Sequence, residues 1–210
     1  MEVRELAVEG ALEFCSDVYY DGRGLVATPF ERATFEAAHG GALFGVAQTI
    51  HSYSQRGVVR GMHYTVTPPG MAKYAYCARG EALYLVADIR VGSPTFGRSD
   101  TVVMDQKSFR SMYLPVGVAN GFVALTDDTV ISYMISKPYV TEDERALSVL
   151  DPELGLPVPD GIELVMAERD RTAITLAEAL RLGLLPSYEQ CVELDRLLSD
   201  PNAAVGATTT

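Results

Sequence analysis

Positive charge is scarce in this 210-residue chain. It has 17 Lys and Arg against 28 Asp and Glu, a formal net charge of −11, and a sequence pI of about 4.7. Nucleic acids and anionic membranes both require a positive protein surface. We therefore expect neither as a partner, and any anionic ligand must meet a local cluster of cationic side chains.

Cysteine is equally scarce. Cys15, Cys77 and Cys191 are far apart, odd in number and never arranged as CxxC. This pattern argues against both a disulfide framework and a cysteine zinc site. The three are expected to be small apolar side chains in or near the core.

Histidine is limited to His39, His51 and His63, with no HxH pair, and His39 is expected at the surface. No metal or other cofactor is expected. A metal-dependent enzyme with a site made from His51, His63 and a carboxylate stays open as the weaker alternative.

Long apolar runs are absent. The start, MEVRELAVEG, carries charges and no apolar signal core, and no later run approaches the roughly 18 apolar residues of a membrane span. We expect a soluble cytoplasmic protein. With 48% hydrophobic residues, the chain suits one core, so residues 1–200 are predicted to be a single domain and residues 201–210 a flexible tail.

Short β-branched and aromatic runs dominate residues 43–150. They are LFGVAQTIHSYS, VVRGMHYTV, KYAYCARG, ALYLVADIRVG, DTVVMD, FRSMYLP, NGFVAL and TVISYMIS. Their close spacing predicts a β-sandwich or closed antiparallel barrel rather than βαβ units.

Helix signals flank these runs. Before them, Thr28 is the expected N-cap, Pro29 the first helical residue and Gly40-Gly41 the stop. After them, Thr175 and Ser187 are expected to cap two helices that pack outside the sheets. The fold class is therefore all-β, with a short N-terminal helix and C-terminal helices.

Three strands carry polar residues among apolar ones. Alternation places Tyr133 on a face with Ile131 and Ile135, and Lys73 on an apolar face where its ammonium needs a partner or a solvated cavity. Strict alternation puts Arg60 and His63 on opposite faces, unless a bulge at Gly61 re-aims one of them. Each residue also has an ordinary explanation: a bonded core histidine, a packed tyrosine, or a lysine that reaches the surface.

The chain also resembles a known family. The segments are GVVRGMHY, AKYAYCARGEALYLVADIRVGSPTFG, YLPVGVANGF, SYMISKPYVTEDER, LDPELGLPVP and ERDRTAITLAEA. In order, from about Leu6 to Pro186, they are similar to the dTDP-4-keto-6-deoxyhexose epimerases, which are RmlC-like cupins, and most of all to the branch serving antibiotic deoxysugar pathways. The resemblance implies a jelly-roll homodimer that needs no metal and inverts a carbon next to the ketone of a dTDP-4-keto-deoxyhexose.

The resemblance also implies roles for particular residues. The catalytic set is His63 as base, Asp170 as the carboxylate that orients it, Tyr133 as acid on the opposite face, and Lys73 at the enolate oxygen. The substrate-binding set is Arg23, Gln48, Arg60, Asn120 and Tyr139. These types suit the chemistry, because a hydrogen next to a ketone needs a base, an oxyanion partner and, for inversion, an acid on the other face.

Three positions depart from the family pattern: Asn120 replaces a histidine, Ile50 an asparagine and Thr28 a glutamate. Asn120 can hydrogen-bond a sugar but cannot carry a proton at neutral pH, which favours inversion at C5, with C3 and C5 together as the runner-up and C3 alone still open. The alternative of another class is a silent cupin that binds a nucleotide sugar without turning it over.

Overall fold

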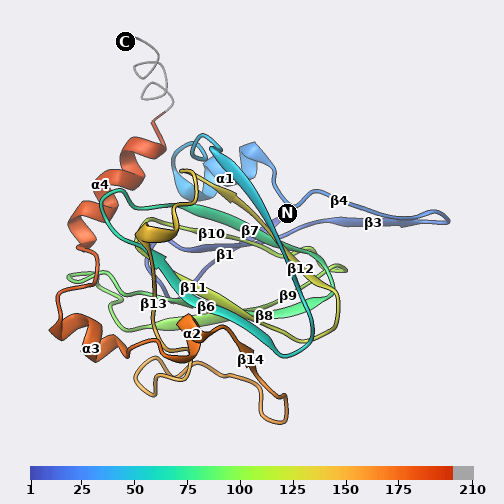
Figure 1. Cartoon of the computed structure of the whole chain (residues 1–210). Helices are drawn as coiled ribbons and strands as arrows, with labels where there is room; N and C mark the ends of the chain where they lie inside the picture. Colours follow the sequence, from blue (N-terminus) through green and yellow to red (C-terminus); the bar gives the residue numbers. More distant parts are fainter. Residues whose placement is uncertain (201–210) are drawn as a thin grey trace.

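Two six-stranded sheets lie face to face in the computed structural model, which describes residues 1–200 (Figure 1). The first sheet has the order β1 (Glu2–Glu5), β2 (Leu12–Cys15), β10 (Ser111–Leu114), β7 (Lys73–Arg79), β12 (Thr129–Ile135) and β5 (Gln48–Ser54). The second has β13 (Glu144–Ala146), β6 (Val58–Thr65), β11 (Ala119–Ala124), β8 (Glu81–Ala87) and β9 (Ser99–Asp105), with β14 (Val165–Met166) parallel to β6. The predicted all-β jelly roll is confirmed.

The main core lies between these sheets. Val86 of β8 and Phe122 of β11 meet Ala75 of β7 and Ile131 of β12, and all four are at most 1% exposed. Each strand contributes alternate residues to this layer because successive side chains point to opposite faces. Lys73 and Tyr133 lie on the same strand faces as Ala75 and Ile131. Their side chains line a cavity at one end of this layer.

The first 27 residues form four strands that the sequence interpretation did not include. β3 (Val18–Asp21) and β4 (Gly24–Ala27) pair only with each other and stand away from the sandwich as an arm (Figure 1). Tyr19, Tyr20 and Val26 on this arm are 69%, 65% and 65% exposed. A free two-stranded hairpin with exposed apolar side chains is marginal by itself.

Helix α1 (Arg32–His39) begins later than predicted. Thr28 and Pro29 lie outside it, and the N-cap is Glu31, whose carboxylate accepts hydrogen bonds from the backbone N–H groups of Ala33 and Thr34. An acidic side chain can replace the expected Thr cap because it satisfies the same free N–H groups. The predicted stop is confirmed at Gly40, where φ is +78°.

The C-terminal helices α2 (Glu168–Arg171), α3 (Leu176–Arg181) and α4 (Tyr188–Leu198) pack outside the sandwich, and a 3-10 turn, η1 (Thr141–Asp143), precedes β13 (Figure 1). The predicted cap of α3 is confirmed, since Thr175 accepts a hydrogen bond from the Glu178 N–H. Ser187 is the N-cap of α4, but its side chain makes no capping bond. The predicted flexible tail, residues 201–210, lies outside the described residues.

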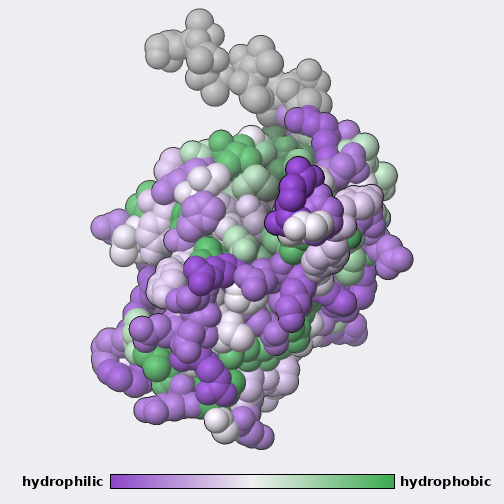
Figure 2. Space-filling model, turned by 90° about the vertical axis from the view of Figure 1, so that its right-hand side faces the viewer, coloured by the Kyte–Doolittle hydropathy of each residue, from purple (hydrophilic) through white to green (hydrophobic). Residues whose placement is uncertain are grey.

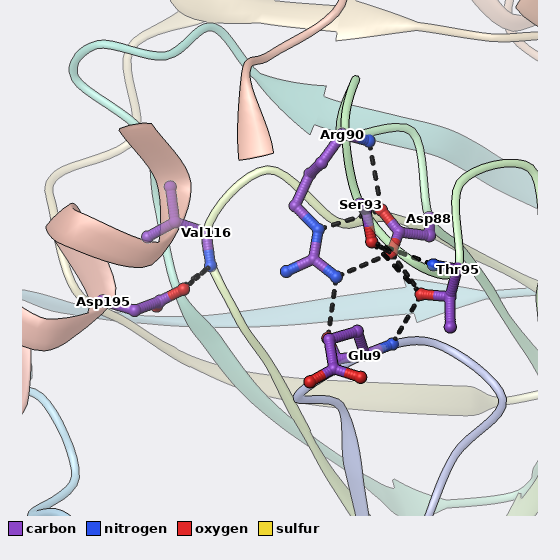
Figure 3. Close-up of polar contacts among 7 residues, drawn as sticks. All are labelled: Glu9, Asp88, Arg90, Ser93, Thr95, Val116 and Asp195. Carbon is purple, nitrogen blue, oxygen red and sulfur yellow. Dashed lines mark hydrogen bonds and ion pairs between the residues drawn. The ribbon is translucent and has the colours of Figure 1, made fainter. Parts of the chain in front are cut away.

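A buried ion pair closes the loop after β8 (Figure 3). The Arg90 guanidinium donates to both oxygens of Asp88, at 2.9 and 2.7 Å, and to the backbone carbonyl of Glu9 at 2.7 Å. The hydroxyls of Ser93 and Thr95 each donate to Asp88 at 2.6 Å. We call this set, Glu9, Asp88, Arg90, Ser93 and Thr95, the Asp88 cluster. It joins the N-terminal loop to the sandwich.

The side toward which the arm extends is mostly hydrophilic, with separate hydrophobic patches among the polar residues (Figure 2). Within residues 1–200, no helix has the length and apolar character needed to cross a membrane.

Candidate active site

A pocket of about 210 Å³ lies between the sheets, and most of the predicted site residues converge on it. Strands β5, β7 and β12 form one wall, and β6 and β11 form the other. Six of the predicted catalytic and substrate-binding residues line it: Arg60, His63, Lys73, Asn120, Tyr133 and Tyr139. Met71, Phe122 and Ile135 add apolar surface. A few converging polar groups in a partly apolar cavity are typical of small-molecule sites.

A β-bulge brings Arg60 and His63 into this one pocket. Asn120 pairs with His63 and Phe122 pairs with Arg60, so β6 has one residue more than β11 over this stretch. Gly61 lies in the bulge with φ of +127°, and a Cβ there would come within 2.5 Å of the Gly121 Cα. Of the two alternatives that the sequence left open, the bulge at Gly61 is confirmed.

His63 is held by Asp170 of α2. The His63 Nε2 lies 2.7 Å from Asp170 Oδ1, and the Gly61 N–H donates to the other carboxylate oxygen at 3.4 Å. Burial acts to raise the pKa of Asp170, but the hydrogen bond and charge of His63 outweigh it and keep that pKa below its ordinary value. An ionised Asp170 can accept a hydrogen bond from the ring, which orients the His63 imidazole and would stabilise its protonated form.

Arg169 adds a cation beside the same ring, and the sequence interpretation did not include it. Its guanidinium lies 2.8 Å from His63 Nε2 and 3.5 Å from both His63 Nδ1 and Asp170 Oδ1, and the residue lines the pocket. In the sequence, the position of Arg169 next to Asp170 in ERDR could have marked it, since neighbours of a site residue on one helical turn share its surroundings. An anionic ligand would find a positive charge here despite the acidic chain.

Lys73 is buried with an uncharged partner. It is 9% exposed, and its ammonium donates to Asn120 Oδ1 at 3.0 Å. Burial lowers the pKa of Lys73, while the negative charge of Glu144, across the pocket, works in the opposite direction. An ammonium has three donors, so Lys73 keeps two N–H bonds for a ligand in the cavity.

Tyr133 belongs to the first sheet and His63 to the second, so they occupy opposite walls of the pocket. The Tyr133 ring packs beside that of Tyr84, a fully buried residue of β8, with 6.4 Å between the ring centroids. Burial raises the pKa of Tyr133 far above its ordinary value. The phenol therefore keeps its proton at neutral pH and can act as an acid.

Gln48 and Tyr139 lie together at the pocket rim, where the Tyr139 N–H donates to Gln48 Oε1 at 2.8 Å. Arg60 is fixed by bonds from its guanidinium to Ser54 Oγ at 3.1 Å and to the Tyr53 carbonyl at 3.2 Å. Arg23 lies elsewhere. It sits in the turn of the β3–β4 arm, 90% exposed, with Asp21 as its partner. The chain therefore does not bring Arg23 to its own pocket.

The alternative metal site made from His51 and His63 does not form. Ile50 and Ser52 line the pocket, so His51, between them on β5, faces away from His63. His51 instead lies 2.8 Å from Ser132 Oγ through its Nδ1. His39, expected at the surface, is half-buried, with its ring stacked on Phe35 at 4.9 Å between centroids.

Known proteins match both this chain and this fold. The family model described as dTDP-4-dehydrorhamnose 3,5-epimerase matches residues 5–178. The chain belongs to this family. The dTDP-4-dehydro-6-deoxyglucose 3-epimerase of Streptomyces bikiniensis is 44% identical over 184 residues, which cover 88% of this chain and 93% of the relative.

Solved structures agree. NovW, a 4-keto-6-deoxy sugar epimerase from the novobiocin biosynthetic gene cluster of Streptomyces spheroides, is 40% identical with a TM-score of 0.86, covering 91% of this chain and 95% of that one. ChmJ, a 3'-monoepimerase from Streptomyces bikiniensis in complex with dTDP-quinovose, is 42% identical with a TM-score of 0.85, covering 91% and 96%. The predicted family and cupin jelly roll are confirmed.

Membership of the epimerase family gives the pocket a chemical context but assigns no role to a residue. The roles of His63, Asp170, Tyr133 and Lys73 stay predictions, supported by their meeting in one cavity. Besides Arg169, the sequence interpretation missed Tyr84 and Glu144. Tyr84 lies in the run ALYLVADIR, where an aromatic residue is ordinary for a buried strand, so no sequence signal marked it.

Proposed function

We propose that the chain inverts a carbon next to the C4 ketone of a dTDP-4-keto-6-deoxysugar, with His63 as base and Tyr133 as acid. The observation that carries this proposal is that the two residues lie on opposite walls of one cavity, with the Lys73 ammonium in its lining. Inversion needs a proton to leave from one face and return to the other, which a single base cannot do.

The reaction begins at His63. Its imidazole takes the proton next to the ketone, and the electron pair moves onto the C4 oxygen to form an enolate. Asp170 stabilises the imidazolium that results, and the buried Lys73 ammonium donates to the developing oxyanion. Tyr133 then gives its proton to the opposite face of the same carbon, and the C4 carbonyl re-forms.

The relatives support C3 as the carbon inverted. The Streptomyces bikiniensis relative is a 3-epimerase, ChmJ is a 3'-monoepimerase, and the family model is a 3,5-epimerase, so C3 is common to all three. From the sequence alone we predicted C5, because Asn120 cannot carry a proton. We propose C3, and the exchange experiment below distinguishes the two carbons.

The same proposal includes a homodimer. The β3–β4 arm exposes Tyr19 and Tyr20 and carries Arg23 away from its own pocket. If a second copy covers the arm, Arg23 can meet the diphosphate in that copy's pocket, near Gln48 and Tyr139. Residues 1–200 acting as one domain and a cytoplasmic location stay part of this proposal.

Deuterium exchange tests the chemistry. The protein is incubated with dTDP-4-keto-6-deoxyglucose in D2O, and deuterium at C3 and C5 is followed by NMR. We expect deuterium to enter at C3 together with inversion there. Exchange at C5 alone would show that C5 is the inverted carbon. The dissociation constant for dTDP is measured in parallel. Binding of dTDP without exchange at either carbon would favour a cupin that binds a nucleotide sugar without turning it over.

The variants His63→Asn and His51→Asn form a matched pair for this assay. His63→Asn should lower exchange by about 10²–10⁴-fold while keeping dTDP affinity. His51→Asn removes an imidazole from the opposite face of the sheet and should leave exchange unchanged. Equal rates in the two variants would rule out His63 as the base.

Mixing two inactive variants tests the dimer. Arg23→Ala and His63→Asn are combined after subunit exchange, and the mass is measured by analytical ultracentrifugation. If Arg23 serves the partner's pocket, a mixed dimer holds one complete site and regains activity. If Arg23 acts within its own chain, or the protein is monomeric, mixing restores nothing.

A further inference from the structure

Glu144 is the one acidic residue in the pocket lining, within the part of the chain that the structure describes. It lies on β13 and pairs with Thr65 of β6, two residues after His63 on that strand. Alternate residues of a strand share a face, so Glu144 and Thr65 lie on the side of β6 that carries His63. Glu144 is 7% exposed, so its carboxylate is a buried charge beside the base.

Only one oxygen of the Glu144 carboxylate has a partner in the protein. The Thr65 hydroxyl donates to Oε1 at 2.5 Å, and within residues 1–200 no other group is hydrogen-bonded or ion-paired to this carboxylate. In the same range, Ser108 Oγ is the one fully enclosed side-chain oxygen without a partner, so Glu144 Oε2 is open to the cavity. A buried carboxylate without a counter-ion is costly, and a ligand that donates to it offsets that cost.

The open oxygen selects a ligand group that donates a hydrogen bond, because an ionised carboxylate only accepts. The proposed substrate has two such groups on its sugar, the hydroxyls at C2 and C3, whereas its C5 carries a methyl group. The C3 hydroxyl changes direction when C3 inverts, but the C2 hydroxyl keeps its place in both epimers. An acceptor fixed by Thr65 therefore suits the hydroxyl at C2.

We propose that Glu144 is a specificity-determining residue: it accepts a hydrogen bond from the C2 hydroxyl, so the chain prefers 2-hydroxy sugars to their 2-deoxy counterparts. A sugar without this hydroxyl leaves the carboxylate buried with no donor, and a site built to bond a hydroxyl rejects such an analogue. This inference rests on the proposed function and names the substrate class of the same pocket.

The test measures kcat/KM for two substrates, dTDP-4-keto-6-deoxyglucose and dTDP-4-keto-2,6-dideoxyglucose. The native chain should prefer the first by about 10–100-fold. The hydrogen bond is the same before and during proton removal, so the difference should appear mainly in KM. Glu144→Met removes the acceptor and should bring the two kcat/KM values to within about threefold of each other.

Glu142→Met is the matched control. Glu142 lies two residues earlier, on η1, and is exposed and outside the pocket lining. This variant removes the same charge from the same segment, so it should keep the native preference for the 2-hydroxy sugar. Loss of the preference in both variants would overturn the inference, because the effect would then not depend on the pocket carboxylate.

The ratio of the two kcat/KM values separates recognition from a structural role. If Glu144 only balanced the charge of Lys73, Glu144→Met would slow both substrates equally and leave the ratio unchanged, which would overturn the inference. Equal values in the native chain, or a higher value for the 2-deoxy sugar, would do the same. Failure of the native chain to turn over either substrate would instead count against the proposed function.

Folding of each variant is checked by circular dichroism. Should Glu144→Met fail to fold, Glu144→Gln decides the question, because it keeps the shape and an acceptor for Thr65 but removes the charge. A hydrogen bond to a neutral group is weaker than one to a charged group, so the preference should fall by about fivefold or more. An unchanged preference would contradict the proposal.

Discussion

The pocket and the Asp88 cluster both bury charge beside strands of one sandwich, and they satisfy it differently. In the cluster, Arg90 and Asp88 are 2% and 0% exposed, and the carboxylate is filled by donors at 2.6–2.9 Å (Figure 3). In the pocket, Lys73 has the neutral Asn120 oxygen as its bonded partner. A buried charge with all its partners supports structure, whereas one with unused donors is available to a ligand.

The difference has an energetic basis. Removing an ion from water costs several kcal/mol, and only close, complete pairing offsets that cost within the protein itself. The Asp88 cluster meets this condition, so removing one member should harm stability. Lys73 lacks such complete pairing, so its replacement should lower turnover without lowering the free energy of unfolding. Four predictions test this comparison.

The largest stability loss is expected for Arg90→Met, which leaves Asp88 buried without its counter-ion. The free energy of unfolding should fall by about 3–5 kcal/mol. Urea denaturation followed by circular dichroism measures it. A loss below about 1 kcal/mol would mean that the cluster does not support the fold.

Lys73→Met is the matched change in the pocket. Turnover should fall by about 10²–10³-fold because the oxyanion loses its donor, while stability should stay equal or rise by about 1–2 kcal/mol. The folded pKa of Lys73 lies below its unfolded value, so the native protein gains stability relative to the variant as pH rises toward 10.5. Denaturation at several pH values and a kinetic assay measure both effects, and destabilisation like that of Arg90→Met would refute the contrast.

Asp195→Asn tests a carboxyl group that is less fully paired than Asp88. Asp195 of α4 accepts the Val116 N–H at 3.0 Å (Figure 3), and burial raises its pKa from 3.8 to about 6. Because the folded value exceeds the unfolded one, its contribution is complete below about pH 4 and is lost as pH rises through 6. Relative to Asp195→Asn, the native protein should lose roughly 2–3 kcal/mol over this window. Parallel curves in thermal melts from pH 4 to 7 would contradict this.

The smallest effects compare two serines. Ser93→Ala removes a 2.6 Å bond to the buried Asp88 carboxylate and should cost about 1.5–3 kcal/mol. Ser52→Ala, in the pocket, removes a 3.3 Å bond to the Ile131 carbonyl and should cost less than about 1 kcal/mol. Chemical denaturation of both variants gives the two values, and equal losses would remove the distinction between the regions.

Much of the fold could be read from local patterns. The strands from β6 to β12 follow runs of β-branched and aromatic residues. As predicted, Thr175 caps the start of α3 and Gly40 ends α1. The first four strands were missed because their runs are short and, in the arm, largely exposed. Helix α1 began late because Glu31 supplied the capping oxygens that Thr28 was expected to give.

The sequence by itself determined which residue types were available: a histidine, a lysine and a tyrosine on strands whose alternation places each on a definite face. Only the tertiary structure decided which of them meet. The Gly61 bulge turns Arg60 to the side of His63, and α2, more than 100 residues later, brings Asp170 within 2.7 Å. Periodicity acts over a few residues, whereas these contacts depend on register and packing between segments far apart in the chain. For the same reason Tyr84 could not be told from an ordinary core tyrosine until the structure showed the Asn120 amide donating to its hydroxyl at 3.0 Å.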